Sequence, residues 1–333
     1  MSPGRVIRQL EALEARRAAG VVTLPDGARL EVGQLHKVLW PRLGITKGAL
    51  MRYYVRIAPL ILPTVRDRPL IMRRYPDGVR AGGFYQQRAP ADTPPGVRTA
   101  VLASDRVVPR RLVGGSLATL LFMTQIAAVS QDPWFSRVHS EDTPDHCVLD
   151  LDPMPGVPFR TVVDVARWVR DELAGLGVAG FPKTSGKTGL HVYVPLAPRT
   201  SYDASRLFAE LVATAVADKH PRVATVERAL RDRGRRVYVD FLQNSRGKTL
   251  ASAYSARGSD DAGVSTPLTW DEVDAGVDRR DFTLRTIDAR VRAVGDLWAA
   301  FRRARGVDLS AVVSGRRPAP SRPRRPRALR PAR

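Results

Sequence analysis

Apolar residues in the first part of the chain recur at spacings that predict alternating helices and strands. Residues 1–20 predict a charged helix, and VVTLPDGARLEV alternates around a Pro-Asp-Gly turn, as a hairpin does. KGALMRYYVRIAPLIL has helical spacing and follows Thr46, a suitable N-cap. PLIMRRYP then predicts a strand, GGFYQQRAP a strand or loop that opens on glycines, and residues 115–129 a buried helix.

The second half of the chain has a regular order of elements. HCVLDLDP predicts a strand, TVVDVARWVRDELAGLG a helix that ends at glycine, and FPKTSGKTGLHVYVPL a glycine-rich turn into a strand. SYDASRLFAELVATAVADKH predicts a second helix, and RRVYVDFLQ a further strand. This order indicates an α/β or α+β catalytic lobe.

These patterns divide the chain into three parts. We expect an N-terminal helical extension over residues 1–27 and one core over residues 28–305. Residues 306–333 alternate Arg with Pro and contain too few apolar residues to fold, so they are predicted to be a disordered basic tail.

The net charge of the chain predicts a polyanionic partner. Lys and Arg number 54 against 33 Asp and Glu, which gives a net charge of +21. Eight arginines lie in residues 316–333, so a net charge of +13 remains on the rest of the chain. Nucleic acid is the first candidate partner and an anionic membrane surface the second.

Features of secreted or membrane proteins are missing from the sequence. Cys147 is the only cysteine, which excludes an internal disulfide and is typical of a reducing compartment. The longest apolar run, residues 117–129, is shorter than the roughly 20 residues of a membrane span. The N-terminus lacks the apolar core of a secretion signal. We therefore expect a cytoplasmic, nucleoid-associated protein with no membrane partner.

Three acidic residues at strand positions are candidate metal ligands. Asp150 and Asp152 lie two apart on a predicted strand, so both carboxylates project from one face. Asp240 ends another apolar strand. Oxygen ligands suit Mg²⁺ or Mn²⁺, and three such acids can hold two ions for nucleotidyl transfer. The alternative for a bare Asp-x-Asp is an exposed edge pair or a turn before proline.

The segment TSGKTGLHVYVP is a candidate phosphate-binding element. Small residues, among them Ser185 and Thr188, let the backbone approach a triphosphate, and Lys187 lies beside them. The spacing of a Walker loop is absent. His191 begins the following strand and is either a phosphate or carboxylate partner or a core histidine.

Four groups of segments in this order carry a family resemblance. They are HKVLWPRLGITKGALMRYY; RYPDGVRAGGFYQQRAP; VLDLDPMPGV with TSGKTGLHVYVPL; and VDFLQNSRGKTLASAYSARG with VSTPLTW. Together they resemble the polymerase domain of bacterial DNA ligase D, within the archaeo-eukaryotic primase superfamily, over roughly residues 28 to 300. The resemblance implies an α+β primase-type catalytic core, in which two mixed α/β lobes, one of them RRM-like, surround a central cleft.

The resemblance also implies roles for individual residues. It places the metal-binding and catalytic acids on Asp150, Asp152 and Asp240, with two Mn²⁺ or Mg²⁺ ions. It implies that the incoming NTP or dNTP contacts Ser185 together with Arg73, Arg233, Gln243 and Arg257, beside the candidate phosphate partners Lys187, Thr188 and His191. Phe84 or Tyr85 is expected to stack on a base, whereas the alternative for each is a core aromatic. Lys37 and Lys47 match lysines that hold a 5′-phosphate across a gap, against the alternative of exposed solvated charges.

The chain departs from the family pattern at two places. SQDPWFSR has Asp132 where many relatives have histidine, and an ionised carboxylate cannot donate a hydrogen bond to a triphosphate. Lys187 precedes Thr188, the position at which some relatives have lysine.

No Lys-x-Asp-Gly adenylation motif occurs, which predicts that the chain has no ligase activity. The chain therefore resembles the stand-alone primase-polymerases that work beside ligase C or ligase D.

The functional prediction is a template-dependent nucleotidyltransferase that prefers ribonucleotides and fills short gaps with a downstream 5′-phosphate. Gapped or primer-template DNA is its expected partner in end joining or excision repair. De novo priming stays open as a further activity. An ATP-dependent DNA ligase and an end-binding protein stay open as further partners. The alternative is a non-catalytic DNA-binding or end-bridging factor. A sugar transferase that uses Asp-x-Asp explains neither the charge nor Lys37 and Lys47.

Overall fold

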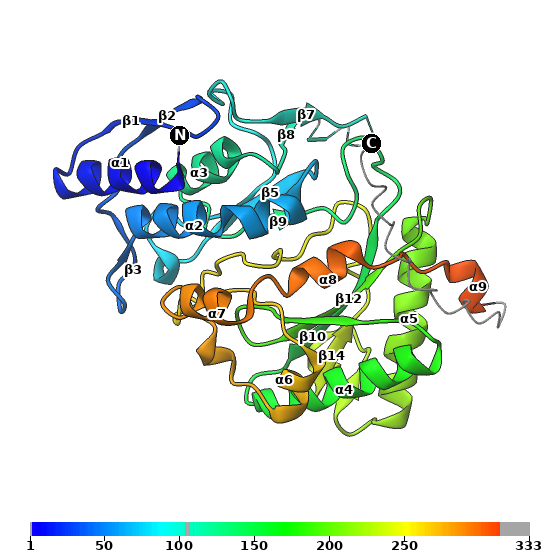
Figure 1. The fold of residues 1–333 in the computed structure, drawn as a ribbon. Helices are drawn as coiled ribbons and strands as arrows, with labels where there is room; N and C mark the ends of the chain where they lie inside the picture. Colours follow the sequence, from blue (N-terminus) through cyan, green and yellow to red (C-terminus); the bar gives the residue numbers. More distant parts are fainter. Residues whose placement is uncertain (1, 104, 106, 109, 314–333) are drawn as a thin grey trace, which may run out of the picture.

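The computed structural model describes residues 2–103, 105, 107–108 and 110–313 (Figure 1). Its N-terminal half contains three long helices and several small sheets. The helices are α1 (Pro3–Ala15), α2 (Lys47–Val65) and α3 (Leu117–Gln125). The strands are β1 (Gly20–Thr23), β2 (Arg29–Val32), β3 (Val38–Trp40), β4 (Ile45–Thr46), β5 (Leu70–Arg74), β6 (Phe84–Gln86), β7 (Thr99–Val101), β8 (Arg110–Leu112) and β9 (Asp132–Pro133).

The C-terminal half is built around one sheet. Its strands are β10 (His146–Pro153), β11 (Phe181–Thr184), β12 (Leu190–Pro195), β13 (Ala224–Thr225) and β14 (Val237–Asp240). The strand order is β11-β12-β10-β14-β13, and only the β13–β14 pair is parallel. The helices are α4 (Phe159–Gly175), α5 (Tyr202–Lys219), α6 (Trp270–Ala275), α7 (Ile287–Val294), α8 (Trp298–Arg303) and α9 (Leu309–Val313).

The two faces of this sheet belong to different hydrophobic cores. Leu149 and Leu151 of β10 pack with apolar residues of α4 and α5, and these two helices cover that face (Figure 1). Val148 of β10 and Tyr193 of β12 belong instead to the core that contains α1, α2 and α3. Side chains alternate along β10, so the face that carries Val148 is turned toward the N-terminal half. Asp150 and Asp152 lie on this same face.

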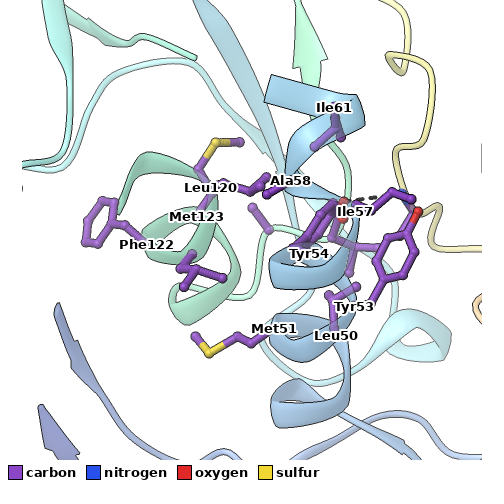
Figure 2. Close-up of a cluster of buried hydrophobic side chains, with 14 of the residues drawn as sticks. Leu50, Met51, Tyr53, Tyr54, Ile57, Ala58, Ile61, Leu120, Phe122 and Met123 are labelled. Carbon is purple, nitrogen blue, oxygen red and sulfur yellow. Dashed lines mark hydrogen bonds between the residues drawn. The ribbon is translucent and has the colours of Figure 1, made fainter. Parts of the chain in front are cut away.

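Helix α2 joins the two halves of the molecule. Its N-cap is Thr46, whose side chain accepts a hydrogen bond from the backbone N–H of Ala49. Figure 2 shows Met51 and Ala58 of α2 on the side toward α3, whereas Tyr53 lies on the other side of the helix. The Tyr53 hydroxyl donates to the carbonyl of Tyr254, 2.6 Å away, and so ties α2 to the C-terminal half.

The predicted α+β architecture is confirmed, and two boundaries differ from the sequence pattern. The helix expected over residues 115–129 ends at Gln125, because Ala127 has a positive φ of 64° and its carbonyl accepts from the N–H of Tyr75. FPKT forms strand β11 in its own right, before the glycine-rich turn.

The prediction of a disordered tail from residue 306 onward is wrong for residues 306–313. Val307 pairs with Leu196, and α9 follows with Leu309 buried, so residues 306–313 are structured. Residues 314–333 of that prediction lie outside the described residues. None of the helices in the described part of the chain has both the length and the apolar content of a membrane span.

Candidate active site

A row of polar side chains crosses the central sheet. The strand register aligns, in order, Lys183 on β11, His191 on β12, Asp150 on β10 and Asp240 on β14. Directly opposed residues on neighbouring strands point to the same face and have Cβ atoms about 4.5–5.5 Å apart. The register therefore brings together two acids that lie far apart in the sequence.

Asp150 is the most buried acid of this row, with 4% of its surface exposed. His191 Nε2 lies 3.2 Å from Asp150 Oδ1, yet this oxygen has no partner with hydrogen-bond geometry in the described part of the chain. Burial, and after it the charge of Asp240, raises the pKa of Asp150 to about 7. Because a buried carboxylate without a hydrogen bond is costly, this place favours a cation or a proton.

The two other acids complete the site in different ways. Asp152 follows Asp150 on the same face at the exposed end of β10, and the charge of Asp150 is the main cause that raises the pKa of Asp152 to about 7. Asp240 accepts hydrogen bonds from the backbone N–H of Leu242 at 2.8 Å and from Gln243 Nε2 at 2.9 Å. Asp240 is therefore held in place, whereas Asp152 is open to solvent.

Lys183 and His191 form the buried end of the row. Lys183 Nζ lies 2.8 Å from His191 Nδ1 and also donates to Ser265 Oγ. Burial is the main cause that lowers the pKa of Lys183 well below its usual range. Burial, followed by the charge of Lys183, does the same to the pKa of His191. His191 is 2% exposed and its Nε2 faces Asp150, so the structure agrees both with the core alternative and with a carboxylate partner.

The acids fit divalent cations by their chemistry. Within the described ranges, no three acidic, histidine or cysteine side chains are already gathered as a complete metal site. Among the described residues, one oxygen of Asp150 nevertheless has no hydrogen-bond partner. Burial, followed by the charge of Asp240, raises the pKa of Asp150, and the charge of Asp150 is the main cause that raises the pKa of Asp152. Mg²⁺ typically takes only one or two carboxylates and fills its remaining positions with water and substrate phosphates. An open carboxylate cluster of this kind suits such a cation.

The loop between β11 and β12 is a compact turn beside these acids. Ser185 Oγ accepts from the backbone N–H groups of Lys187 at 3.1 Å and Gly189 at 3.0 Å. Gly186 has a φ of +75°, and a Cβ there would lie 2.8 Å from the backbone nitrogen of Ser265. Gly189 likewise has no room for a Cβ against the carbonyl of Leu151. The turn thus requires both glycines.

Three basic side chains approach Asp132 beside this turn. The pKa of Asp132 is lowered by the positive charges of Arg257, Lys187 and Arg73, and Arg257 has the largest effect of the three. Arg257 Nη1 donates to the carbonyl of Ser185 at 2.7 Å, which fixes its position. Burial, followed by Arg257 and Arg73, lowers the pKa of Lys187 to about 8. The three cations form a positive cluster suited to phosphate groups.

Asp132 is an unusual acid in this cluster. Ser130 donates to its Oδ2 at 2.7 Å, but its Oδ1 has no hydrogen-bond partner among the described residues. Burial is the main cause that raises the pKa of Asp132. The side chain lines a cavity of about 340 Å³ together with Tyr85, Gln243 and Arg257. Lys248 and the strand residue Ile71 are also in its wall. We call it the main cavity for its place beside the cation cluster, since the groove lined by Thr188 is larger, at about 810 Å³.

The two aromatic residues of β6 are on the surface rather than in the core. Phe84 is 48% exposed and Tyr85 is 64% exposed. The register pairs Arg74 with Phe84 and Arg73 with Tyr85, and each guanidinium lies over the paired ring at 5.5 and 5.4 Å respectively. The core alternative for these aromatics is therefore wrong, and Tyr85 is available for stacking at the edge of the main cavity.

Of the predicted nucleotide contacts, Arg233 and Thr188 lie around a different part of the site. The guanidinium of Arg233 stacks on the ring of Tyr238 at 3.6 Å, and the charge of Arg233 lowers the pKa of Asp152. Thr188 is exposed and lines a separate groove with Pro153 and Arg279. The structure thus places Arg233 and Thr188 around the exposed end of β10, apart from Asp132 and Tyr85.

Lys37 and Lys47 are neighbours at the start of α2. The backbone N–H of Lys47 donates to the carbonyl of Lys37 at 2.8 Å. Lys47 Nζ is buried and donates to the carbonyl of Gln125 at 3.2 Å, while Lys37 makes a long 3.8 Å contact with exposed Asp77. Burial, followed by the charge of Lys37, lowers the pKa of Lys47 to about 8. Lys47 is therefore not a solvated surface charge.

Sequence reasoning missed Lys183. The apolar context FPKT resembles an ordinary strand, and a lysine in it is usually an exposed edge residue. Its position two residues before Ser185 was the available signal, since side chains two apart in an extended segment point to the same side.

Comparisons with known proteins agree on one family. Residues 46–298 match the family described as LigD, primase-polymerase domain. The bifunctional non-homologous end joining protein LigD of Bacillus subtilis is 29% identical over 291 residues, which cover 87% of this chain and 47% of that protein. The multifunctional LigD of Pseudomonas aeruginosa is 29% identical over 289 residues, which cover 86% of this chain and 34% of that protein. The chain thus spans less than half the length of these curated relatives.

A solved structure extends the similarity to three dimensions. The polymerase domain from Mycobacterium tuberculosis ligase D, in complex with DNA, superimposes with a TM-score of 0.74 at 31% identity. The similarity covers 81% of this chain and 96% of that one.

Proposed function

The chain belongs to the family of LigD primase-polymerase domains, and from this premise we propose that it is a template-dependent nucleotidyltransferase that extends a primer on DNA. The observation that carries the proposal is the register that pairs Asp150 directly with Asp240, with Asp152 on the same face of β10. In the reaction a primer 3′-hydroxyl attacks the α-phosphate of a nucleotide and pyrophosphate leaves. Catalysis then rests on positioning and on electrostatic stabilisation.

The acids of the row would hold two Mn²⁺ or Mg²⁺ ions. When bound, such ions lower the pKa of the attacking hydroxyl and offset the charge of the leaving pyrophosphate. The protein's own contribution is the orientation of the carboxylates. Gln243 and the backbone of Leu242 fix Asp240, and His191 faces Asp150.

The cationic cluster binds the triphosphate in this proposal. Arg73, Lys187 and Arg257 surround the turn at Ser185, and Arg257 is itself tied to the Ser185 carbonyl. Tyr85 at the rim of the main cavity stacks on a base. Arg233, whose charge acts on Asp152, contacts the incoming nucleotide beside the acids.

Finer features of the activity are part of the same proposal. The preferred substrate is a ribonucleotide, and the preferred template is a short gap whose downstream 5′-phosphate is held by Lys37 and Lys47. The reaction serves DNA end joining or excision repair, beside an ATP-dependent DNA ligase and an end-binding protein, and the chain itself has no ligase activity.

Incorporation of labelled NTP on a gapped duplex with Mn²⁺ tests the function. We expect extension by the wild-type chain, loss of extension in Asp150→Ala, and DNA binding close to wild type in that variant. Asp218→Ala, at an exposed acid of α5, is the matched control and should extend normally. A non-catalytic end-bridging factor would bind DNA with strong salt dependence but incorporate nothing with any metal. Extension retained by Asp150→Ala would overturn the metal mechanism.

A further inference from the structure

A second, smaller cavity adjoins the main cavity. It has a volume of about 230 Å³ and is lined by Gln87, Arg111, Trp134, Arg246 and Lys248 among other residues. Gln87, Gly247 and Lys248 also belong to the wall of the main cavity, so the two spaces are adjacent. We call this space the Trp134 cavity.

The walls of the Trp134 cavity contain two buried donors without acceptors. Arg111 is 3% exposed, and its Nε and Nη2 are held by Asp105 while Nη2 also donates to Gln87 Oε1 at 2.8 Å. Its Nη1 has no partner among the described residues. Trp134 is 2% exposed, and its indole Nε1 has none either. Native proteins rarely leave buried donors unpaired, so two in one wall indicate a missing acceptor.

The charges of the same walls are positive on balance. Asp105 neutralises Arg111, and Asp142 neutralises Arg246 at 2.6 Å. Lys248 is exposed and makes no ion pair or side-chain hydrogen bond within the described ranges. The Arg111 guanidinium lies over the Trp134 ring at 5.0 Å, so ring and guanidinium hold each other in place. The missing acceptor is therefore expected to be an anion.

We propose that the Trp134 cavity binds a phosphodiester of the DNA strand that runs past the main cavity, with Lys248 supplying the charge and Trp134 and Arg111 supplying hydrogen bonds. This inference rests on the proposed function, because a strand beside the nucleotide is what places a phosphate there. The wall shared with the main cavity favours a strand over a separate small ligand. Lys248 lines both spaces, so the DNA backbone is expected to pass next to it.

The test measures DNA affinity without metal or nucleotide, with the full chain and a labelled primer-template. Lys248→Ala should lower the slope of log K against log salt by about 0.9, as expected for the loss of one phosphate contact. Trp134→Phe keeps an aromatic side chain but removes the N–H donor, so it should weaken binding roughly threefold to tenfold with an unchanged slope. Arg206→Ala, at an exposed arginine of α5 on the far side of the sheet, is the matched control and should change neither.

A scan with single neutral methylphosphonates locates the contact. A methylphosphonate at one position of one strand should weaken DNA binding by the wild type. The same substitution should cause no further loss of affinity in Lys248→Ala. If no position in either strand shows this coupling, the proposal is wrong, even where Trp134→Phe fails to fold. If inorganic phosphate alone shifts the Trp134 indole N–H signal and the scan is flat, the cavity takes a free anion rather than a strand.

The outcome is separable from that of the proposed function. A chain that binds primer-template but ignores both substitutions would remove only this inference. A chain whose wild type neither binds DNA nor incorporates nucleotide would remove the proposed function as well.

Discussion

Asp150 and Asp240 are direct partners in the antiparallel pairing of β10 with β14, so their carboxylates project side by side from one face of the sheet. Burial, and after it the charge of Asp240, disfavours ionisation of Asp150 and raises its pKa to about 7. The chain therefore maintains a carboxylate cluster that is costly to ionise when no cation is bound.

This cost predicts how metal binding depends on pH. The pKa values of Asp150 and Asp152 rise from 3.8, the ordinary value of an aspartate, to about 7 in the folded protein. Their protonated forms therefore stabilise the fold fully below about pH 4, and this contribution is lost as the pH rises through 7. A divalent cation binds the deprotonated forms, so Mn²⁺ should raise the Tm more at pH 8 than at pH 5.5.

Differential scanning fluorimetry with and without Mn²⁺ at both pH values measures this difference. The double variant Asp150→Asn with Asp152→Asn should lose the Mn²⁺-dependent rise in Tm at pH 8. Asp218→Asn should retain it. Equal Mn²⁺ effects at pH 5.5 and pH 8 in the wild-type chain would contradict the prediction.

Recognition of a gap is expected to depend on Lys37 and Lys47. The two residues are adjacent through the hydrogen bond between their backbones, and mutual repulsion contributes to the lowered pKa of Lys47. A bound phosphate dianion would relieve that repulsion. The variant Lys37→Ala with Lys47→Ala should therefore lose most of the rate advantage that a downstream 5′-phosphate gives, while extension on an open template is spared.

Matched gapped duplexes with and without the 5′-phosphate provide the control for this prediction. The wild type should distinguish them and the double variant should not. Equal losses on gapped and open templates would instead indicate a general effect on folding or DNA binding.

Stacking at the rim of the main cavity is expected to depend on Tyr85. Its ring is 64% exposed and rests against Arg73, so it is held in place without being buried. Base stacking on an aromatic side chain contributes about 1–3 kcal/mol. Tyr85→Ala should weaken binding of primer-template or nucleotide by roughly fivefold to a hundredfold, whereas Tyr85→Phe should bind almost as the wild type does. Equal behaviour of the two variants in an anisotropy titration would remove the stacking role.

Local patterns predicted the elements of this fold better than they predicted its contacts. The helix after Thr46 and the strand that carries Asp150 follow from spacing alone. The end of α3 does not, because it depends on Ala127 adopting a positive φ while its carbonyl pairs with distant Tyr75.

The candidate site shows the same limit. Its acids were selected by residue type, but the pairing of Asp150 with Asp240 depends on a strand order that no local pattern encodes. Lys183 was missed because its burial is created by Ser265 and His191, which reach it only in the folded chain.

Asp132 yields the prediction most particular to this chain, since it is an acid inside a cluster of cations. Its charge interacts with Arg257, Lys187 and Arg73, so an ionised Asp132 weakens the attraction of that cluster for a triphosphate. Asp132→Asn keeps the size of the side chain and removes the charge, and it should lower the KM for NTP roughly threefold to tenfold, a change of about 1 kcal/mol. Burial raises the pKa of Asp132, so the gain should be largest at high pH, where the wild-type carboxyl is ionised. The gain should shrink as the pH falls, because a protonated wild-type Asp132 resembles the variant.

Steady-state extension assays across pH measure the KM of both proteins. Ser130→Ala is the control, because it alters a hydrogen bond of Asp132 but keeps the carboxyl. A KM that rises in Asp132→Asn would show that the carboxylate instead accepts a hydrogen bond from the bound nucleotide through the oxygen that has no partner among the described residues.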